Sequence, residues 1–313
     1  MRTKKSALTF FSLVVILGVL LSGCGQAAPA PQISTQQVDS AKVISDAIVS
    51  YYEKMPQDSY KIDDPILKAE LAKNPDKYVV LDVRQADAYA KGHIKGAINV
   101  AYGPEIATNL DKIRAVAKGK TLVVQCYTGQ TAGQTDSMLN LAGINTRSLN
   151  YGFDGLQGWN TLKFPVVTDS TPMPDAPVVE SPNKIIDDAV KKYFKDMPQD
   201  SYKIDDPILK EELAQNADKY FIVDVRKKID FDNGHIKGAI NVPFGSEIGK
   251  QLGMLKEKSQ GKTLVAYCYT GQTAGQTVPL LNIAGINAKS LNFGFGIVGL
   301  PKSWSGLGYE QEK

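Results

Sequence analysis

The sequence contains one ten-residue stretch twice, and each copy begins with a cysteine. "CYTGQTAGQT" occupies residues 126–135 and recurs letter for letter at 268–277, in a chain of 313 residues with three cysteines. A thiol becomes a nucleophile or a sulfur carrier when its thiolate is stabilised, and backbone amides at the start of a helix can provide that stabilisation. The repeated stretch therefore raises the question of whether it is built around a reactive sulfur.

The residues around each cysteine predict a strand that runs into a helix. "TLVVQ" at 121–125 is a short apolar run, as expected of a buried parallel strand, and 131–142 is helical. Between them lies a loop without proline, whose N–H groups are free to point at one spot and in which Gly129 permits a positive φ. The predicted catalytic residues are Cys126 and Cys268, and the predicted substrate-binding loops are Tyr127, Thr128, Gly129, Gln130, Thr131 and Tyr269, Thr270, Gly271, Gln272, Thr273.

Two other interpretations of these cysteines stay open from the residues alone. Each cysteine could be a small buried apolar side chain beside ordinary turn glycines. Cys126 and Cys268 could also form a disulfide if the protein is exported and the two loops meet. The identity of the whole ten-residue loop in two repeats that differ elsewhere favours a reactive thiol.

The cysteine loops belong to a duplication of about 142 residues. "MPQDSYKIDDPIL" at 55–67 returns at 197–209, and "GHIKGAINV" at 92–100 returns at 234–242. A period this long indicates duplicated domains rather than a solenoid. We expect a first domain over 39–166, a proline-rich semi-extended linker over 167–182 and a second domain over 183–309.

Strands and helices alternate within each repeat. In the first repeat we expect helices at 40–55, 65–73, 104–117 and 131–142, with Asp64 as the N-cap of the second, and strands at 78–83, 97–101, 121–125 and 147–150. Alternating strands and helices predict an α/β fold with a parallel sheet that is covered on both faces.

The first residues of the chain are expected to lie outside this fold. Three basic residues precede the apolar run 7–21, and "LSGC" follows it. Such a segment is typical of a signal peptide over 1–23, and the four letters resemble the lipobox of bacterial lipoproteins. The resemblance implies lipid on Cys24, a tether over 24–38 and an extracytoplasmic location at a bacterial membrane. An ordinary signal peptide or an uncleaved anchor are the alternatives.

Charge disfavours one class of partner. The formal net charge is +3, and loss of residues 1–23 would remove three basic and no acidic residues, which leaves a net charge of zero. A protein without basic excess has little with which to neutralise phosphates, so we expect no nucleic-acid partner.

The order "DVR", "GHIKGAINV" and a strand ending in "CYTGQT" resembles the rhodanese (sulfurtransferase) family in both repeats. The resemblance implies two tandem domains, each with a five-stranded parallel sheet flanked by helices. It also implies a cysteine that accepts a sulfane sulfur as a persulfide and passes it on. Many tandem members keep the cysteine in the C-terminal domain alone, whereas this chain has it in both. The loop also lacks the Arg or Lys that many members carry near the cysteine.

Several neighbouring residues narrow the chemistry. Phosphatases with this fold place an arginine six residues after the cysteine, where this chain has Ala132 and Ala274, so phosphoryl transfer would lack its charge clamp. His93 and His235 are expected to hydrogen-bond their own turns. Arg84 and Arg226 could attract an anionic donor or simply pair with the adjacent strand-end aspartates.

The sequence therefore predicts a membrane-anchored sulfurtransferase with no metal and no organic cofactor. Its partners would be a small anionic sulfur donor such as thiosulfate and a thiol or cyanide acceptor. The alternative is a catalytically idle rhodanese-like module that binds a partner or senses sulfur or redox state at the cell surface.

Overall fold

The computed structural model describes residues 39–313. The expected signal peptide over 1–23, the lipidated Cys24 and the tether over 24–38 lie outside the described residues. Within 39–313, no helix is both long enough and apolar enough to span a bilayer.

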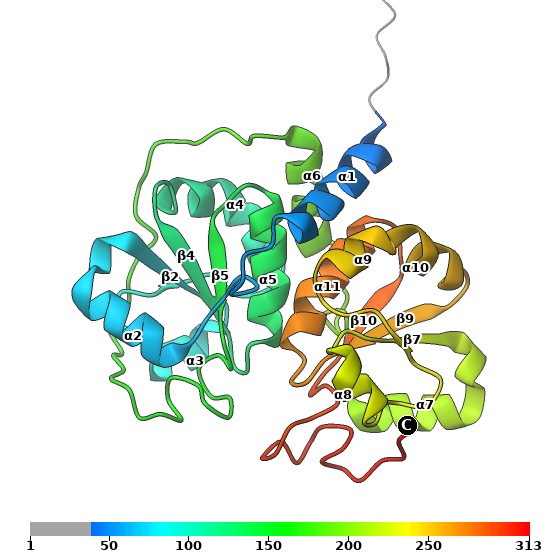
Figure 1. Cartoon of the computed structure of the whole chain (residues 1–313). Helices are drawn as coiled ribbons and strands as arrows, with labels where there is room; N and C mark the ends of the chain where they lie inside the picture. The colour runs from blue at the N-terminus through cyan, green and yellow to red at the C-terminus, as the bar shows by residue number, and fades with distance from the viewer. Residues whose placement is uncertain (1–38) are drawn as a thin grey trace, which may run out of the picture. The chain divides into compact units, whose positions relative to one another are not determined.

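The first repeat alternates strands and helices as its apolar runs predict (Figure 1). Its elements are α1 (Ser40–Glu53), β1 (Lys61–Ile62), α2 (Asp64–Lys73), a 3-10 turn η1 (Pro75–Lys77), β2 (Tyr78–Asp82), α3 (Ala86–Lys91), β3 (Ile98–Asn99), α4 (Pro104–Val116), β4 (Thr121–Gln125), α5 (Gln130–Leu141) and β5 (Thr146–Leu149). The short elements β1 and α3 were not predicted, because two paired residues or one and a half helical turns leave too little periodicity.

The second repeat follows the same order with one break. Its elements are α6 (Lys184–Lys195), β6 (Lys203–Ile204), α7 (Asp206–Asn216), a 3-10 turn η2 (Ala217–Lys219), β7 (Tyr220–Asp224), α8 (Lys228–Asp232), β8 (Ile240–Asn241), α9 (Ser246–Lys250), α10 (Leu252–Lys258), β9 (Thr263–Tyr267), α11 (Gln272–Ile283) and β10 (Ala288–Leu291). The pair α9 and α10 takes the place of the continuous α4.

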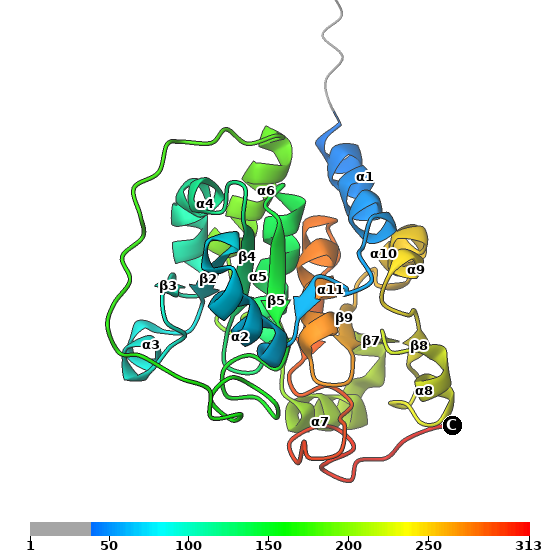
Figure 2. The same cartoon turned by 60° about the vertical axis from the view of Figure 1, so that its left-hand side comes forward.

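A five-stranded parallel sheet forms the centre of each repeat (Figure 2). The strand orders are β1-β5-β4-β2-β3 and β6-β10-β9-β7-β8, and every strand pair is parallel. This confirms the prediction of two α/β units, each with a five-stranded parallel sheet. β4 and β9 are the central strands, so the cysteines that follow them lie at the carboxyl edge where parallel sheets place their sites.

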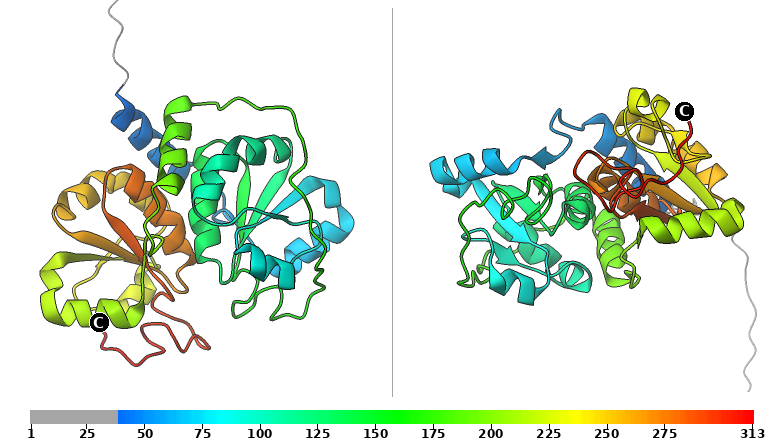
Figure 3. Two further views of the ribbon diagram at one scale, coloured as in Figure 1. Left: turned by 180° about the vertical axis from the view of Figure 1, so that it is seen from behind. Right: turned by 90° about the horizontal axis from the view of Figure 1, so that it is seen from below.

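The N-terminal helix of each repeat packs on the other repeat. Helix α1 lies against α9 of the second repeat, and α6 lies against α4 of the first (Figures 1 and 3). The two helices contribute buried Ile48 and Val190, each fully inaccessible, to one apolar cluster that is shared by both repeats and contains both loop cysteines. The repeats are therefore joined by an exchange of helices as well as by the linker.

A second contact between the repeats is made by the helices that follow the cysteine loops. Helices α5 and α11 pack directly on each other. They approach closely because a Cβ on Gly133 would lie 2.7 Å from the carbonyl oxygen of Gln272, and one on Gly275 would lie 2.6 Å from that of Gln130. Any larger side chain at these two positions would force the helices apart.

One predicted helix start differs by a residue. The N-cap of α2 is Asp63, and Asp64 is the first helical residue, 1% exposed. Burial raises the pKa of the Asp64 carboxyl from 3.8 to about 8. Its counterpart Asp206 behaves alike, with a pKa raised by burial to about 7. Near neutral pH the Asp64 carboxyl is therefore largely protonated in the folded protein, and the Asp206 carboxyl about half protonated.

Candidate functional site

Both loop cysteines lie at the start of a helix and are almost inaccessible. Cys126 is 2% exposed and Cys268 is 1% exposed, and both are free thiols. The N-cap residues of α5 and α11 are Gly129 and Gly271, with φ of 99° and 89°, a region in which glycine is favoured. The Gly129 N–H donates to the Cys126 Sγ at 3.1 Å, whereas within residues 39–313 no N–H donates to the Cys268 Sγ.

A glycine-rich turn after the last strand of each repeat, residues 152–154 and 294–296, hydrogen-bonds to the cysteine loop; we call it the corner. The Phe153 N–H donates to the Cys126 carbonyl at 2.7 Å, and the Asp154 N–H donates to the Tyr127 carbonyl at 2.8 Å. The corner comes so close that a Cβ on Gly152 would lie 2.6 Å from the Cys126 oxygen. Because these carbonyls are bonded to the corner, the peptide groups of the loop are fixed rather than free to rotate.

The second loop is held by the same contacts. The Phe295 N–H donates to the Cys268 carbonyl at 2.7 Å, and the Gly296 N–H donates to the Tyr269 carbonyl at 2.9 Å. Gly294 stands where Gly152 stands in the first repeat, with 2.5 Å between its would-be Cβ and the Cys268 oxygen. The two cysteines therefore have a common backbone scaffold.

Cys268 lines a cavity of about 310 Å³ whose walls come from both repeats. The second repeat provides the cysteine, four of the five predicted loop residues, and the stretch after each of β7 and β8. The first repeat provides a strip around β1 and the corner after β5. The complete lining is Ser59, Lys61, Asn150, Tyr151, Val225, Lys227, Pro243, Phe244, Cys268, Tyr269, Thr270, Gln272, Thr273 and Ile297.

Two lysines in this lining were not predicted as site residues. Lys61 lies in β1 of the first repeat, and Lys227 is the N-cap of α8. Lys227 follows "DVR" directly and could have been found from its place after a strand end. Lys61 could not, because more than 200 residues separate it from Cys268 and only the packing of the repeats joins them.

Tyr269 is fixed in place beside the cavity. Its hydroxyl donates to the carboxylate of Asp230 in α8. Burial and this hydrogen bond raise the pKa of Tyr269 to about 12, so the phenol is neutral. In the first repeat the residue at the position of Asp230 is Ala88, and Tyr127 is 42% exposed. The two loops are thus identical in sequence but differ in their surroundings.

Arg84 and Arg226 are buried and paired. Arg84 is 3% exposed, and its Nη2 lies 2.7 Å from the Asp82 carboxylate and 2.8 Å from the Gly92 carbonyl. Arg226 makes the same contacts, at 2.6 Å to Asp224 and 2.7 Å to Gly234. This geometry does not support the anion-attracting role considered for the two arginines, because their charge is already neutralised and out of solvent. It matches the ion-pair interpretation instead.

The loop glutamines serve the interface between the repeats. The Gln130 Nε2 donates to the Ser290 Oγ at 2.8 Å, and the Gln272 Nε2 donates to the Ser148 Oγ at 3.0 Å. Together with the close approach at Gly133, this explains why the repeated stretch extends beyond the residues next to the sulfur. Part of the identity that favoured a reactive thiol is therefore a requirement of symmetric packing.

The histidines and tryptophans are structural. The His93 Nδ1 lies 2.9 Å from the Tyr89 carbonyl, and the ring stacks on Tyr89.

Trp159 and Trp304 donate to carbonyls six residues further on, at 2.9 and 3.0 Å. The two tryptophans are thus equivalent, and a three-residue insertion in the second repeat hides the match at the constant offset. Within residues 39–313 no cluster of three metal-ligating side chains occurs.

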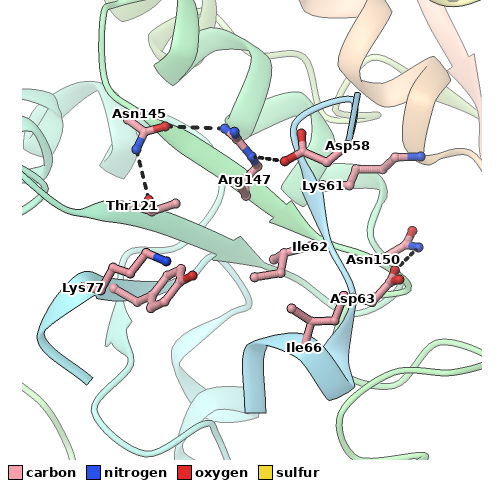
Figure 4. A pocket seen from close by; sticks show the side chains of 11 residues that line it. Asp58, Lys61, Ile62, Asp63, Ile66, Lys77, Thr121, Asn145, Arg147 and Asn150 are labelled. Carbon is pink, nitrogen blue, oxygen red and sulfur yellow. Dashed lines mark hydrogen bonds and ion pairs between the residues drawn. The ribbon is translucent and has the colours of Figure 1, made fainter. Parts of the chain in front are cut away.

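A larger cavity, of about 450 Å³, lies on the outer side of β1 (Figure 4). Arg147 in it binds Asp58 at 2.9 Å, and Asn150 binds Asp63 at 2.8 Å. The lining contains no cysteine or histidine, and its cationic Arg147 is already paired. This cavity is larger than the one at Cys268, but its side chains offer no nucleophile, so we place the candidate site at Cys268 and its counterpart at Cys126.

Comparison with known families identifies the class of protein. The family described as "Rhodanese-like domain" matches residues 66–158 and 208–296, which together make up more than half of the chain. The chain therefore belongs to the rhodanese-like domain family, with two tandem copies. No curated protein matches the sequence significantly.

Three of the solved structures that are similar to this chain differ in how much of each chain the similarity covers. A thiosulfate sulfurtransferase from Pseudomonas aeruginosa is 17% identical, with 84% of this chain and 47% of that chain covered and a TM-score of 0.36. The chain thus spans about half the length of that protein. A protein from Lactobacillus plantarum is 34% identical over 36% of this chain and 89% of that chain, with a TM-score of 0.28. A rhodanese-related protein from Thermoplasma volcanium is 27% identical over 35% and 98%, with a TM-score of 0.28.

Proposed function

We propose that the protein is a sulfurtransferase that carries a sulfane sulfur on Cys126 and Cys268. The observation that carries the proposal is the setting of Cys268. A free thiol lies at a strand end and a helix N-terminus, on a rigid loop, in a cavity lined by two lysines. Membership of a family of sulfurtransferase type supports the same reading.

The reaction proceeds in two displacements. The cysteine thiolate attacks the outer sulfur of a donor such as thiosulfate, a new S–S bond forms, and the bond between the two donor sulfurs breaks. Sulfite leaves with the electron pair, and the cysteine is left as a persulfide. A nucleophile such as cyanide or a thiolate then attacks the outer persulfide sulfur, takes it away and returns the cysteine thiolate.

The chain's own groups have distinct parts in these steps. At the start of α5 the Gly129 N–H faces the Cys126 sulfur at 3.1 Å and stabilises its negative charge. The glycine corners hold the loop peptides in this orientation before substrate arrives. Preorganised dipoles of this kind cost no rearrangement during the reaction.

A thiosulfate:cyanide assay on the variants Cys126→Ser, Cys268→Ser and the double variant tests the proposal. We expect thiocyanate from the wild type, partial activity in each single variant and none above background in the double variant. Production of thiocyanate by the folded double variant at the wild-type rate would overturn it. No thiocyanate from the folded wild type with several donors and acceptors would favour the rival, a rhodanese-like binding or sensing module.

We also propose that the protein is anchored through lipid on Cys24, outside the cytoplasm of a bacterium. The proposal rests on the basic and apolar leader and the "LSGC" letters alone. Cells fed a labelled fatty acid should label the wild type and leave the Cys24→Ala variant unlabelled. Label that persists on the variant would remove the basis for this anchor.

A further inference from the structure

The cavity at Cys268 is not built by the second repeat alone. Ser59, Lys61, Asn150 and Tyr151 of the first repeat line it together with Lys227 and the loop of the second. In Figure 4 the Lys61 side chain leaves its strand toward the pale orange ribbon of the second repeat, away from the centre of the outer cavity. Lys61 therefore stands between the outer cavity and the cysteine site and borders both.

The cavity lining has an unbalanced positive charge. It contains Lys61 and Lys227 and no aspartate or glutamate. Within residues 39–313, neither lysine forms an ion pair with any acidic side chain.

Two acids that contact lining residues are held by neutral side chains and not by the lysines. Asp230 accepts the hydroxyl of Tyr269, and Asp63 accepts the amide of Asn150 at 2.8 Å. Two lysines without carboxylate partners around a concave, partly buried site attract anions more strongly than the same charges on an open surface.

The first repeat lacks part of this arrangement. At the position of Lys227, the N-cap of α8, it has Gln85, the N-cap of α3. Lys61 has the counterpart Lys203 in β6, so only one of the two lysines has an equivalent. Identical cysteine loops are therefore placed beside different charges.

We infer that Cys268 belongs to a composite anion site that is completed by Lys61 of the first repeat. Because of Lys61 and Lys227, a doubly charged donor such as thiosulfate transfers its sulfur to Cys268 ahead of Cys126. The inference rests on the proposed function for the identity of the donor. The composite anion site itself rests on the cavity and its charges. The first centre, which has Gln85 at the position of Lys227, reacts more slowly with such a donor.

A pair of alkylating probes tests the charge preference without requiring sulfur transfer. Iodoacetate is anionic and iodoacetamide is neutral, and both form a thioether with the same thiol. Peptide masses over time give the rate of each probe at each cysteine. We expect the iodoacetate-to-iodoacetamide rate ratio to be about threefold to tenfold higher at Cys268 than at Cys126, and to fall as salt is added.

Substitutions then assign the effect to residues. Lys61→Gln and, separately, Lys227→Gln should lower the ratio at Cys268 about threefold or more and leave the ratio at Cys126 unchanged. Gln85→Lys should raise the ratio at Cys126. Lys77→Gln is the matched control, because Lys77 borders the outer cavity and binds Glu70 at 3.2 Å, and it should change neither ratio.

Thiosulfate loading of the two cysteine peptides, followed in the same proteins, separates the two levels of the proposal. Faster loading at Cys268 that Lys61→Gln abolishes supports both. If neither cysteine loads while the probe ratio follows the lysines, the sulfurtransferase assignment fails and the composite anion site stands. If both load equally and the lysine variants leave the probe ratio unchanged, the sulfurtransferase assignment stands and the inference is overturned.

Discussion

At the scale of single residues, the cysteine sites depend on buried charges that never touch the sulfur. Arg84 is 3% exposed and Asp82 is inaccessible, and the pair fixes the end of β2 next to β4. Arg84 also stacks on Phe153, the residue whose N–H holds the Cys126 carbonyl. The arginine therefore supports the cysteine loop through the corner. In our proposal the anionic donor is attracted by Lys61 and Lys227 instead.

The residue-scale prediction concerns this pair. Asp82→Ala should lower the free energy of unfolding by about 3–5 kcal/mol, because it leaves a buried guanidinium without a counter-ion. Asp87→Ala removes the partner of Lys91 in an exposed pair and should cost within about 1 kcal/mol. Urea unfolding of both variants measures the difference. A loss at Asp82 no larger than that at Asp87 would contradict the structural role.

At the scale of helices and strands, charges specify which helix packs where. Arg114 in α4 is 5% exposed and pairs with Asp187 of α6, while Lys191 of α6 binds Asp111 of α4 at 3.0 Å. Had α1 packed on α4, Ser45 would stand in the place of Asp187 and leave Arg114 unpaired. On the other side, a Cβ on Gly249 of α9 would lie 3.5 Å from the Tyr52 Cβ of α1, an ordinary van der Waals contact.

The exchanged helices give a prediction with its own matched control. Ile48→Ala in α1 should raise the hydrogen-exchange rate of amides in α9, which belongs to the other repeat. Val190→Ala, at the equivalent position of α6, should instead act on α4. Each removes methyl groups from a fully buried site, at a cost of about 1–4 kcal/mol. Faster exchange in α4 after Ile48→Ala, with α9 unchanged, would mean that the helices are not exchanged.

Many of the helices and strands could be predicted from the sequence. The features that could not be predicted depend on contacts between residues far apart in the chain. The strands β2 and β4 and the helices α2, α4 and α5 follow from apolar runs, prolines and glycines close along the chain. The exchange of α1 and α6 was not predicted because either repeat offers an apolar groove, and the decisive partners Arg114 and Asp187 lie 73 residues apart. Lys61 was missed as a site residue for the same reason, whereas Cys268 was found from its local strand-to-helix junction.

At the scale of the whole molecule, the two repeats share one core. The largest apolar cluster contains both cysteines and residues from both repeats, with α5 and α11 at its centre. Asp136 of α5 is buried in this interface and accepts hydrogen bonds from Asn140 at 3.0 Å and Gln276 at 3.1 Å. Its counterpart in α11 is Val278, so the interface has a single carboxyl at this level.

Asp136 makes the stability of the interface depend on pH. Burial raises the pKa of this carboxyl from 3.8 to about 7, so the folded protein keeps a proton that the unfolded chain releases near pH 3.8. The contribution of Asp136 to the free energy of unfolding therefore falls as pH rises from about 4 to about 7 and stays low above it. Asp136→Asn keeps the shape and removes the titration.

We expect urea unfolding to show that Asp136→Asn gains stability relative to the wild type between pH 5 and pH 8. Comparing the two proteins at each pH cancels the contributions of Asp64 and Asp206, whose pKa values are also raised by burial. A difference between variant and wild type that is the same at both pH values would show that Asp136 does not titrate in this range.

The most direct test of the central claim is the mass of the two cysteine peptides after the purified protein has been incubated with thiosulfate and digested without reductant. The account predicts that one sulfur atom is added to the Cys126 peptide and one to the Cys268 peptide, with Cys268 loaded first. It also predicts that cyanide removes both and releases thiocyanate. A folded protein in which neither peptide gains mass, or in which the added mass survives cyanide, would contradict it.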